Sequence, residues 1–388
     1  MRLAFLFGSG VSVPAGMPTT GEIAERIFSG YGVARHTDES YYFGPPLYPD
    51  IQDVDDHVTS VVAFLNLLED ERRRFYGDLY RVNYEDAAYM ASQLADSEAM
   101  EFENPVTLAL IEKLESSPVY RETVVKRWMG NGHESYDVHS IARETVNYIK
   151  CVVCGMLWTQ PLRMDHLGFL RDAHSEFRME QVDIFTLNND LLLETYLRAE
   201  ELTFIDGFTE PINDVRYWDR TLYEEPSASL RLFKLHGSLG CYQYDDGIGI
   251  ASGNSHTRIT GRDGSAQYSI FSTPLILVGT FNKMLQYTMG FFADLFVLFY
   301  TNLHKADALI VCGYGFGDKG INTQVLEWLR SSTKKRMVII HPEPLRLKEC
   351  ARGAVKGHWD ALERSGQLVI ISRKIEEISW EDVASVLA

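Results

Sequence analysis

Hydrophobic residues along the chain follow two different periods. The first apolar run, Leu3–Phe7, has the length of a strand. After residue 180, strand-like runs begin at Val182 and recur at Leu202–Ile205, Leu230–Leu235, Leu275–Val278, Ala308–Cys312, Arg336–Ile340 and Leu368–Ile371. Helical periods lie between or after them, at Lys283–Leu303, Ile321–Arg330, Val355–Glu363 and Trp380–Leu387. This alternation predicts an α/β fold with a mostly parallel, Rossmann-like sheet covered on both faces.

The chain between these regions has a helical period throughout. Its clearest helix face carries Val54, Val58, Val61, Leu65 and Leu68. Similar periods recur at Tyr84–Leu94, Val106–Leu114, Tyr120–Met129, Val138–Leu157 and Leu167–Phe177. We therefore predict an inserted all-helical subdomain over residues 45–178, and a Rossmann-like domain built from residues 1–30 and 179–388.

Composition narrows the function classes. The 388 residues are 45% hydrophobic and 23% charged, which is ordinary for a globular protein. The formal net charge of −17 argues against direct binding to nucleic acid or to an anionic membrane, because phosphate contacts need clustered Lys and Arg. Five cysteines are too few for a disulfide framework and suit a reducing cytoplasm. The most apolar stretch, Met289–Tyr300, is interrupted by Asp294 and is shorter than the roughly 20 residues that span a bilayer.

A glycine-rich loop follows the first strand. It runs from Gly8 to Pro18, and Thr19 and Glu22 then have the spacing of a capping box that begins a helix. Glycines between a strand and a helix let the backbone approach an anion, so the loop is a candidate phosphate cradle. A tight turn that binds no ligand explains the glycines equally well.

Two further loops carry polar side chains at the ends of predicted strands. Asn188 and Asp190 follow the strand that begins at Val182, and His236 follows Leu230–Leu235. Side chains at the carboxyl ends of parallel strands face the ligand crevice, where an imidazole can act as a base. The alternatives are an Asx cap that begins the next helix and a histidine of the core.

The last candidate loop follows the strand Ala308–Cys312. It reads Gly-Tyr-Gly-Phe-Gly-Asp from Gly313 to Asp318 and continues to Ile321 and Asn322. Bare glycine backbone suits contact with a nucleotide, although a flexible connection to the next helix would have the same composition. In a doubly wound sheet this loop and the previous ones lie at the same edge.

Together these motifs resemble those of the sirtuins. The sirtuin loop Gly-Ala-Gly-Ile-Ser-x-x-x-Gly-Ile-Pro is similar to the residues from Gly8 to Pro18. The sirtuin motif Thr-Gln-Asn-x-Asp is similar to Thr186–Asp190, which equates Asn188 with the catalytic asparagine. The catalytic histidine, followed by Gly-Ser or Gly-Ala, is similar to His236 with Gly237 and Ser238.

Other parts depart from the sirtuin deacylases. Thr19-Thr20-Gly21 stands where they have Asp-Phe-Arg, and Cys241 stands alone where they have two zinc-binding Cys-x-x-Cys pairs. Cys151 and Cys154 are spaced as such a pair, but their helical period makes them core residues. We expect no zinc and no other metal.

The stretch from Gly313 to Asn322 resembles bacterial antiviral sirtuin-like proteins, which hydrolyse NAD. The resemblance implies NAD as substrate, with Asn188 orienting water, His236 as base and Asp190 bonding Asn188 or capping the helix. It assigns the diphosphate to Gly8, Ser9, Gly10, Val11 and Ser12. It places Thr186, Gly313, Tyr314, Gly315, Asp318 and Asn322 among the further NAD contacts, those from Gly313 onward toward the adenosine.

The resemblance also implies a controlled activity. We expect a homo-oligomer or a partner chain, because one arrangement in the family pairs a sirtuin-like subunit with a HerA-type ATPase. Three functions stay open. They are NAD hydrolysis, NAD-dependent deacylation or ADP-ribose transfer, and binding of NAD or ADP-ribose without turnover.

Overall fold

A computed structural model describes residues 1–36, 39–44, 53–77, 80, 82–99, 104–125, 137–176, 178–211, 216–225, 229–243, 250–252, 273–279 and 282–387. The chain forms two compact units. The first consists of Met1–Met17, Thr159–Leu277 and Met284–Ala388, and the second of Pro18–Trp158 and Val278–Lys283. The domain limits expected from the sequence stay a prediction.

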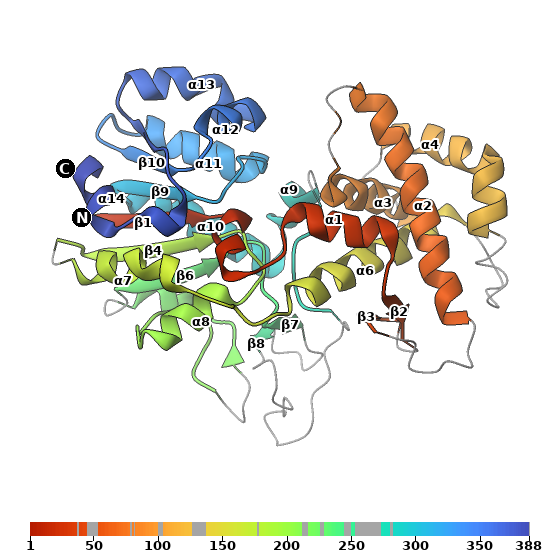
Figure 1. The fold of residues 1–388 in the computed structure, drawn as a ribbon, viewed down its shortest axis with the longest axis horizontal. Helices are drawn as coiled ribbons and strands as arrows, with labels where there is room; N and C mark the ends of the chain where they lie inside the picture. The colour runs from red at the N-terminus through yellow and green to blue at the C-terminus, as the bar shows by residue number, and fades with distance from the viewer. Residues whose placement is uncertain are drawn as a thin grey trace. The chain divides into compact units, whose positions relative to one another are not determined.

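The first unit is built on a six-stranded parallel sheet with the order β11-β10-β9-β1-β4-β6 (Figure 1). Its strands are β1 (Arg2–Phe7), β4 (Gln181–Thr186), β6 (Leu230–Lys234), β9 (Ala308–Cys312), β10 (Arg336–Ile340) and β11 (Leu368–Ile371). The chain passes outward from β1 through β4 and β6, then returns past β1 to β9. The carboxyl ends of β1 and β9 therefore lie at the switch point of the sheet, where open α/β sheets bind ligands.

Helices cover both faces of this sheet, as the sequence predicts. On one face, strand residues such as Leu6, Phe233 and Val311 pack with α10 (Gly290–Lys305), α11 (Lys319–Arg330) and α13 (Gly353–Arg364). On the other face, Phe5 and Ile184 pack with α7 (Gly168–Ser175), α8 (Leu192–Ala199) and α14 (Trp380–Leu387). Because side chains alternate along a strand, neighbouring residues of one strand belong to different cores.

The predicted Rossmann-like α/β fold class is confirmed, and the strands Ala308–Cys312, Arg336–Ile340 and Leu368–Ile371 have the predicted bounds. Two predicted strands are wrong. In Leu202–Ile205 only Ile205 reaches the sheet, through a bridge to Arg231, because the chain turns at Gly207 with a φ of 81°. In Leu275–Val278 only Ile276 forms a bridge, and its partner Gly237 lies in a turn.

Helix prediction is wrong in two places. The helix expected over Lys283–Leu303 consists of α9 (Asn282–Gln286) and α10, with Tyr287 in the break between them. A short helix, α12 (Pro344–Cys350), was not predicted. The first unit also contains a small antiparallel sheet of β5 (Arg216–Tyr217), β8 (Ile250–Ser252) and β7 (Cys241–Gln243).

The second unit is mainly helical. Its helices are α1 (Thr20–Ser29), α2 (Asp53–Tyr76), α3 (Tyr84–Ala99), α4 (Pro105–Ser116), a π-helix at Tyr120–Val125, and α6 (Val138–Leu157). The predicted capping box of α1 is present, because Thr19 and Glu22 bond each other's backbone amides. The unit also contains a hairpin of β2 (Val33–Arg35) and β3 (Tyr41–Phe43). Within the described part of the chain, no helix is long and apolar enough to cross a membrane.

Candidate functional site

Glycines bring two loops into backbone contact at the switch point. Gly8 and Gly10 follow β1, and Gly313 follows β9. A Cβ atom on Gly8 would lie 2.6 Å from the Gly313 carbonyl oxygen, and one on Gly313 would lie 2.4 Å from the Val11 nitrogen. Gly313 also has a φ of 66°, which side-chain-bearing residues rarely adopt. The glycines of these two motifs therefore allow the loops to pack against each other.

Most backbone amides of the first loop are bonded within the protein. Gly8 and Gly10 donate to Cys312 and Gly313 across the loop contact, at 3.1 and 3.0 Å. Val11 and Ser12 donate to carbonyls within their own loop, both at 3.0 Å. These four amides are therefore engaged within the protein, and the assignment of the diphosphate to this loop stays a prediction. Ser9 and Gly10 are the exposed residues at the tip of this loop.

Asn188 is held in one orientation. Its side-chain nitrogen donates to the Gly8 carbonyl at 3.1 Å and to the Ser12 hydroxyl at 2.9 Å. A carbonyl can only accept, so the amide nitrogen and not its oxygen faces Gly8. Its backbone amide donates to the hydroxyl of buried Thr186 at 3.1 Å. Both side-chain hydrogens are therefore used, and the Oδ1 atom is the acceptor that Asn188 can offer a ligand.

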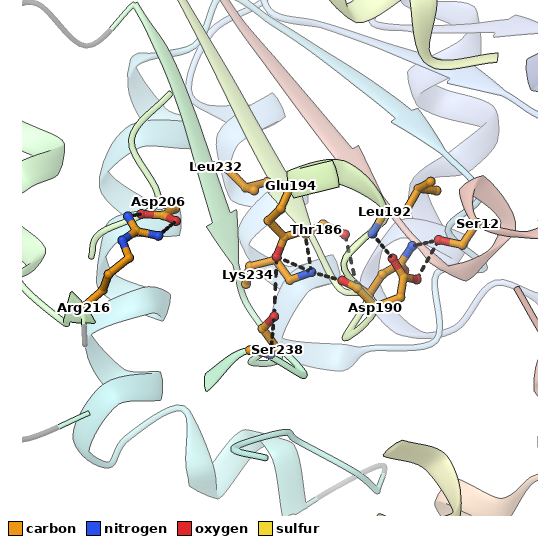
Figure 2. Close-up of polar contacts among 12 residues, drawn as sticks. Ser12, Thr186, Asp190, Leu192, Glu194, Asp206, Arg216, Leu232, Lys234 and Ser238 are labelled. Atoms are coloured by element: carbon orange, nitrogen blue, oxygen red, sulfur yellow. Dashed lines mark hydrogen bonds and ion pairs between the residues drawn. The ribbon is translucent and has the colours of Figure 1, made fainter. Parts of the chain in front are cut away.

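Asp190 both caps a helix and supports Asn188 through Ser12. One carboxylate oxygen accepts from the Leu192 amide at 3.0 Å, at the start of α8. The other accepts from the Ser12 hydroxyl at 2.7 Å (Figure 2). The link from Asp190 to Asn188 therefore passes through Ser12, and the roles expected for Asp190 stay predictions.

A buried lysine joins the loops after β4 and β6. The Lys234 ammonium donates to the Asp190 carbonyl and lies 3.2 Å from the Glu194 carboxylate (Figure 2). The Ser238 hydroxyl, two residues beyond His236, lies 3.5 Å from the same carboxylate. The side chains of Lys234 and Glu194 are only 9% and 8% exposed. This ion pair, the Lys234–Glu194 pair, therefore connects the segments that carry Asn188 and His236.

His236 lies in a second polar cluster at the same edge of the sheet. Its Nε2 atom is 2.6 Å from the Tyr287 hydroxyl and 3.3 Å from the Asp318 carboxylate. Tyr287 in turn donates to Asp318 at 2.9 Å. The structure thus brings Asp318 to His236, whereas the sequence placed it toward the adenosine.

The loop after β9 is shaped by its own side chains. Tyr314 donates to the side-chain oxygen of Asn322 at 2.8 Å, and Asn322 donates to the carbonyls of Phe316 and Arg352. Both groups of the Asn322 side chain are therefore engaged in holding the loop. Gly315 is exposed, with no heavy atom within 4 Å of a Cβ placed on it.

Sequence reasoning missed several residues that support the site. It gave no role to Lys234, Glu194 or Tyr287. A charge on the buried face of a strand or helix is the signal that could have identified Lys234 and Glu194, because such charges are rarely buried unpaired. Tyr287 had no comparable signal, since an aromatic residue in an apolar helical stretch is ordinary.

His166 supports the glycine-rich loop from another segment. Its Nε2 atom lies 2.9 Å from the Val11 carbonyl, so this nitrogen carries the ring's hydrogen. Burial lowers the pKa of His166, which keeps the ring neutral at physiological pH. His166 is therefore a further missed residue, and it fixes the position of this loop.

Cys312 is the last residue of β9 and precedes Gly313 of the site. Burial raises the pKa of the Cys312 thiol to about 12, so it is protonated at neutral pH and is a poor nucleophile. Cys151 and Cys154 lie on α6 and are buried. Among the residues that the structure describes, no group of three or more His, Cys, Asp or Glu side chains could hold a metal ion.

Two comparisons with known proteins find similarities, and a third finds none. Residues 182–358 match the family model of the SIR2-like domain, whereas a search of curated proteins finds no match. A SIR2 homologue solved in complex with NAD is 14% identical, with a TM-score of 0.38 over 99% of this chain and 89% of that one. A Sir2 structure concerned with the mechanism and regulation of these enzymes is 11% identical, with a TM-score of 0.40 over 100% and 91%. Since both TM-scores are below 0.5, the fold assignment depends on the strand order. The matched residues 182–358 include Asn188, His236 and the loop after β9.

Proposed function

We propose that this protein hydrolyses NAD at the bond between nicotinamide and ribose, giving nicotinamide and ADP-ribose. One observation carries the proposal: Asn188, His236 and the contact of Gly8 with Gly313 all follow the carboxyl ends of strands in one parallel sheet. That edge is where such sheets bind nucleotides. The match of residues 182–358 to the SIR2-like domain supports the same assignment.

The bond to be broken suits this set of side chains. Its cleavage passes through an oxocarbenium-like state, as in the hydrolysis of glycosides. Nicotinamide leaves from a cationic form, so the leaving group needs no general acid. An amide and an imidazole are then sufficient, and a pair of carboxylates is not required.

Asn188 would orient the attacking water. Because its nitrogen donates to Gly8 and Ser12, its Oδ1 atom accepts a hydrogen from water or from a ribose hydroxyl. His236 would act as general base toward the same group, a contribution of about 10²–10⁴-fold. Asp190 would hold the orientation of Asn188 through Ser12.

The two glycine-rich loops would hold the rest of the substrate. On the first loop the exposed Ser9 and Gly10 are the residues best placed to meet the diphosphate. Val11 and Ser12 would shape the loop from within. Gly313, Tyr314 and Gly315 would line the adenosine side, with Asn322 fixing the conformation of that loop.

The first experiment measures nicotinamide release from NAD by the purified protein, with Asn188→Ala and His236→Ala beside it. We expect release by the parent and a loss of about 10²-fold or more in each variant. Thermal stabilisation by NAD, measured on the same samples, separates lost binding from lost chemistry.

Other results would favour the remaining classes. NAD stabilisation without nicotinamide release under any condition would indicate a binding protein. NAD consumption only with an acetyl-lysine peptide would indicate deacylation, and ADP-ribose found on a protein would indicate transfer. Absence of both binding and release would contradict the proposal.

We further propose that activity is controlled by assembly, because free NAD hydrolysis would damage the cell that makes it. The resemblance to antiviral sirtuin-like proteins suggests a cytoplasmic defence role, with a homo-oligomer or a HerA-type ATPase as the controlling assembly. Native mass spectrometry combined with activity measured across protein concentrations tests this point. A fully active monomer would contradict it.

A further inference from the structure

His236, Tyr287 and Asp318 form one buried cluster of polar side chains. All three side chains are buried, and they come from different segments of the first unit. Three short contacts join them, from His236 Nε2 to Tyr287 at 2.6 Å, from Tyr287 to Asp318 at 2.9 Å and from His236 Nε2 to Asp318 at 3.3 Å. The positions of the shared hydrogens can be worked out from these contacts.

Tyr287 has one hydroxyl hydrogen, and we assign it to the contact with Asp318, because a carboxylate only accepts. A distance of 2.6 Å between Nε2 and the Tyr287 oxygen then requires a hydrogen on Nε2, because two lone pairs that close together repel. If Tyr287 instead donated to Nε2, both its oxygen and the ring nitrogen would face the Asp318 carboxylate with no hydrogen between them. A hydrogen on Nε2 is therefore the arrangement that satisfies all three contacts.

Asp318 is well suited to accept these hydrogens. Its other carboxylate oxygen accepts from the Ile321 amide at 3.0 Å, at the start of α11. This 12-residue helix directs the positive end of its dipole at Asp318 and so favours the carboxylate form. Asp318 can thus accept from Ile321, Tyr287 and His236 together.

Tyr287 is packed so that it cannot readily turn away. Its ring stacks on Phe296 of α10, with centroids 4.5 Å apart. A Cβ atom on Gly320 would lie 3.0 Å from the Tyr287 ring, so α11 approaches it closely. Such packing fixes a side chain in place and suits a positioning role better than a movable gate.

We infer that Tyr287 and Asp318 are positioning residues that hold the proton of His236 on Nε2, so that Nδ1 is the atom that acts as base. This inference rests on the proposed function. Nδ1 takes a proton from the attacking water as the new bond forms between the water oxygen and the ribose carbon. The bond from that carbon to nitrogen breaks, its electron pair leaves with nicotinamide, and the proton on Nδ1 passes to solvent. The charge on the ring is meanwhile stabilised by Asp318.

Asp318 and Tyr287 thereby take new roles in the site. Asp318 becomes a residue that acts through His236 rather than a contact of the adenosine. Tyr287 becomes part of the site although it lies in the break between α9 and α10.

The test combines NMR with kinetics on the full chain. Histidine ¹⁵N shifts report which ring nitrogen carries the hydrogen, without any turnover, and His236→Gln identifies the signals. The variants are Asp318→Asn and Tyr287→Phe. Asn keeps an oxygen for the Ile321 amide but presents an amide donor to His236. Tyr223→Phe is the matched control, because it also removes a buried tyrosine hydroxyl, one that donates to the Leu232 carbonyl.

We expect the parent to carry the hydrogen on Nε2 and Asp318→Asn to lose this preference. Its kcat should fall by about 10²–10⁴-fold with little change in KM. Tyr287→Phe should keep the hydrogen on Nε2, because Asp318 still accepts it, and lose about 10-fold or less in kcat. Tyr223→Phe should change neither quantity.

Two results would overturn the inference: a parent ring without hydrogen on Nε2, or a rise in nicotinamide release in Tyr287→Phe, which would make Tyr287 a gate. If the hydrogen is on Nε2 in the parent and shifts in Asp318→Asn, the positioning role is supported even if no variant releases nicotinamide. In that case it is the proposed function that fails.

Discussion

Two buried ion pairs share strand β6 and serve different purposes. Arg231 and Asp183 are register partners on β6 and β4, and three residues further along β6 Lys234 pairs with Glu194. Their side chains are similarly buried: Arg231 and Asp183 are each 6% exposed, and Lys234 and Glu194 are 9% and 8% exposed. Position along the strand, more than burial, therefore separates a pair that holds the fold from one that holds the site.

The further hydrogen-bond partners of the Arg231–Asp183 pair lie away from the loops of the candidate site. Arg231 donates both bonds of a fork to Asp183, at 2.7 and 2.8 Å, and further bonds to Asn302 of α10 and to the Tyr223 carbonyl. It lies on the face of the sheet that packs against α10. None of these partners belongs to the loops at the carboxyl edge.

The further hydrogen-bond partners of the Lys234–Glu194 pair lie in the loops of the candidate site. Lys234 holds the Asp190 carbonyl, and Glu194 lies on α8 and within reach of Ser238. Lys234 is three residues after Arg231, so alternation along the strand turns it to the opposite face. Disturbing this pair should therefore move Asn188 and His236 relative to each other.

The largest effect is expected for Lys234→Met. Nicotinamide release by the folded protein should fall by about 10²-fold, because a shift of about 1 Å in a site can cost that much. Stability should also fall by about 3–5 kcal/mol, since Glu194 is left buried without its partner. The measurements are nicotinamide release well below the melting temperature and urea unfolding. Unchanged release in folded Lys234→Met would remove the distinction between the two pairs.

Arg231→Met is the matched variant for the other pair. It leaves Asp183 buried without its partner, so the free energy of unfolding should fall by a similar amount, about 3–5 kcal/mol. Release per folded molecule should stay within about two-fold of the parent, a change smaller than 0.5 kcal/mol in the barrier. A loss of activity in fully folded Arg231→Met would show that both pairs serve the site.

Replacing both residues of each ion pair by apolar residues separates the role of charge from the role of packing. Replacing a whole buried ion pair by apolar residues is often neutral or stabilising by about 1–4 kcal/mol. Asp183→Leu with Arg231→Leu should therefore recover the stability lost in Arg231→Met and keep its activity. Glu194→Leu with Lys234→Met should recover stability but not nicotinamide release. Recovery of both properties in the second double variant would mean that the loops need packing and not charge.

The pH dependence of the unfolding free energy tests whether burial of the Asp183 carboxyl outweighs its attraction to Arg231. Burial raises the pKa of Asp183 and outweighs the attraction of the Arg231 guanidinium. A carboxyl whose pKa is raised on folding stabilises the protein below its unfolded value, about 3.9, and this stabilisation is lost as the pH rises through the folded pKa. The unfolding free energy of the parent, relative to the Asp183→Leu, Arg231→Leu variant, should therefore fall as the pH rises from about 4. A difference that grows with pH would mean that attraction outweighs burial.

The sequence predicted the sheet well because each buried strand is a short apolar run. It failed at Ile205 and Ile276, where an apolar run contributes a single bridge and a turn then redirects the chain. It also joined α9 and α10, since the apolar period continues across the break at Tyr287. Local patterns do not contain the tertiary contacts that decide these cases.

The candidate site was predictable only as a set of loops. Parallel strands guarantee that the loops after β1, β4, β6 and β9 share an edge of the sheet. Which atoms meet there depends on side-chain packing, so the contact of Asp318 with His236 and the link between Asn188 and Asp190 through Ser12 could not be read from spacing.

The smallest effect is expected for Ser238→Ala. Its hydroxyl lies 3.5 Å from the Glu194 carboxylate, at the limit of a hydrogen bond, and also accepts from the Gly240 amide at 3.3 Å. Loss of such long bonds should cost about 1 kcal/mol or less in stability. Release should fall by less than about 5-fold, because 1 kcal/mol in the barrier corresponds to that factor. A loss of release as large as that of Lys234→Met would show that the Lys234–Glu194 pair positions His236 mainly through Ser238. A small loss would indicate that the pair supports the site mainly through the contact of Lys234 with the Asp190 carbonyl.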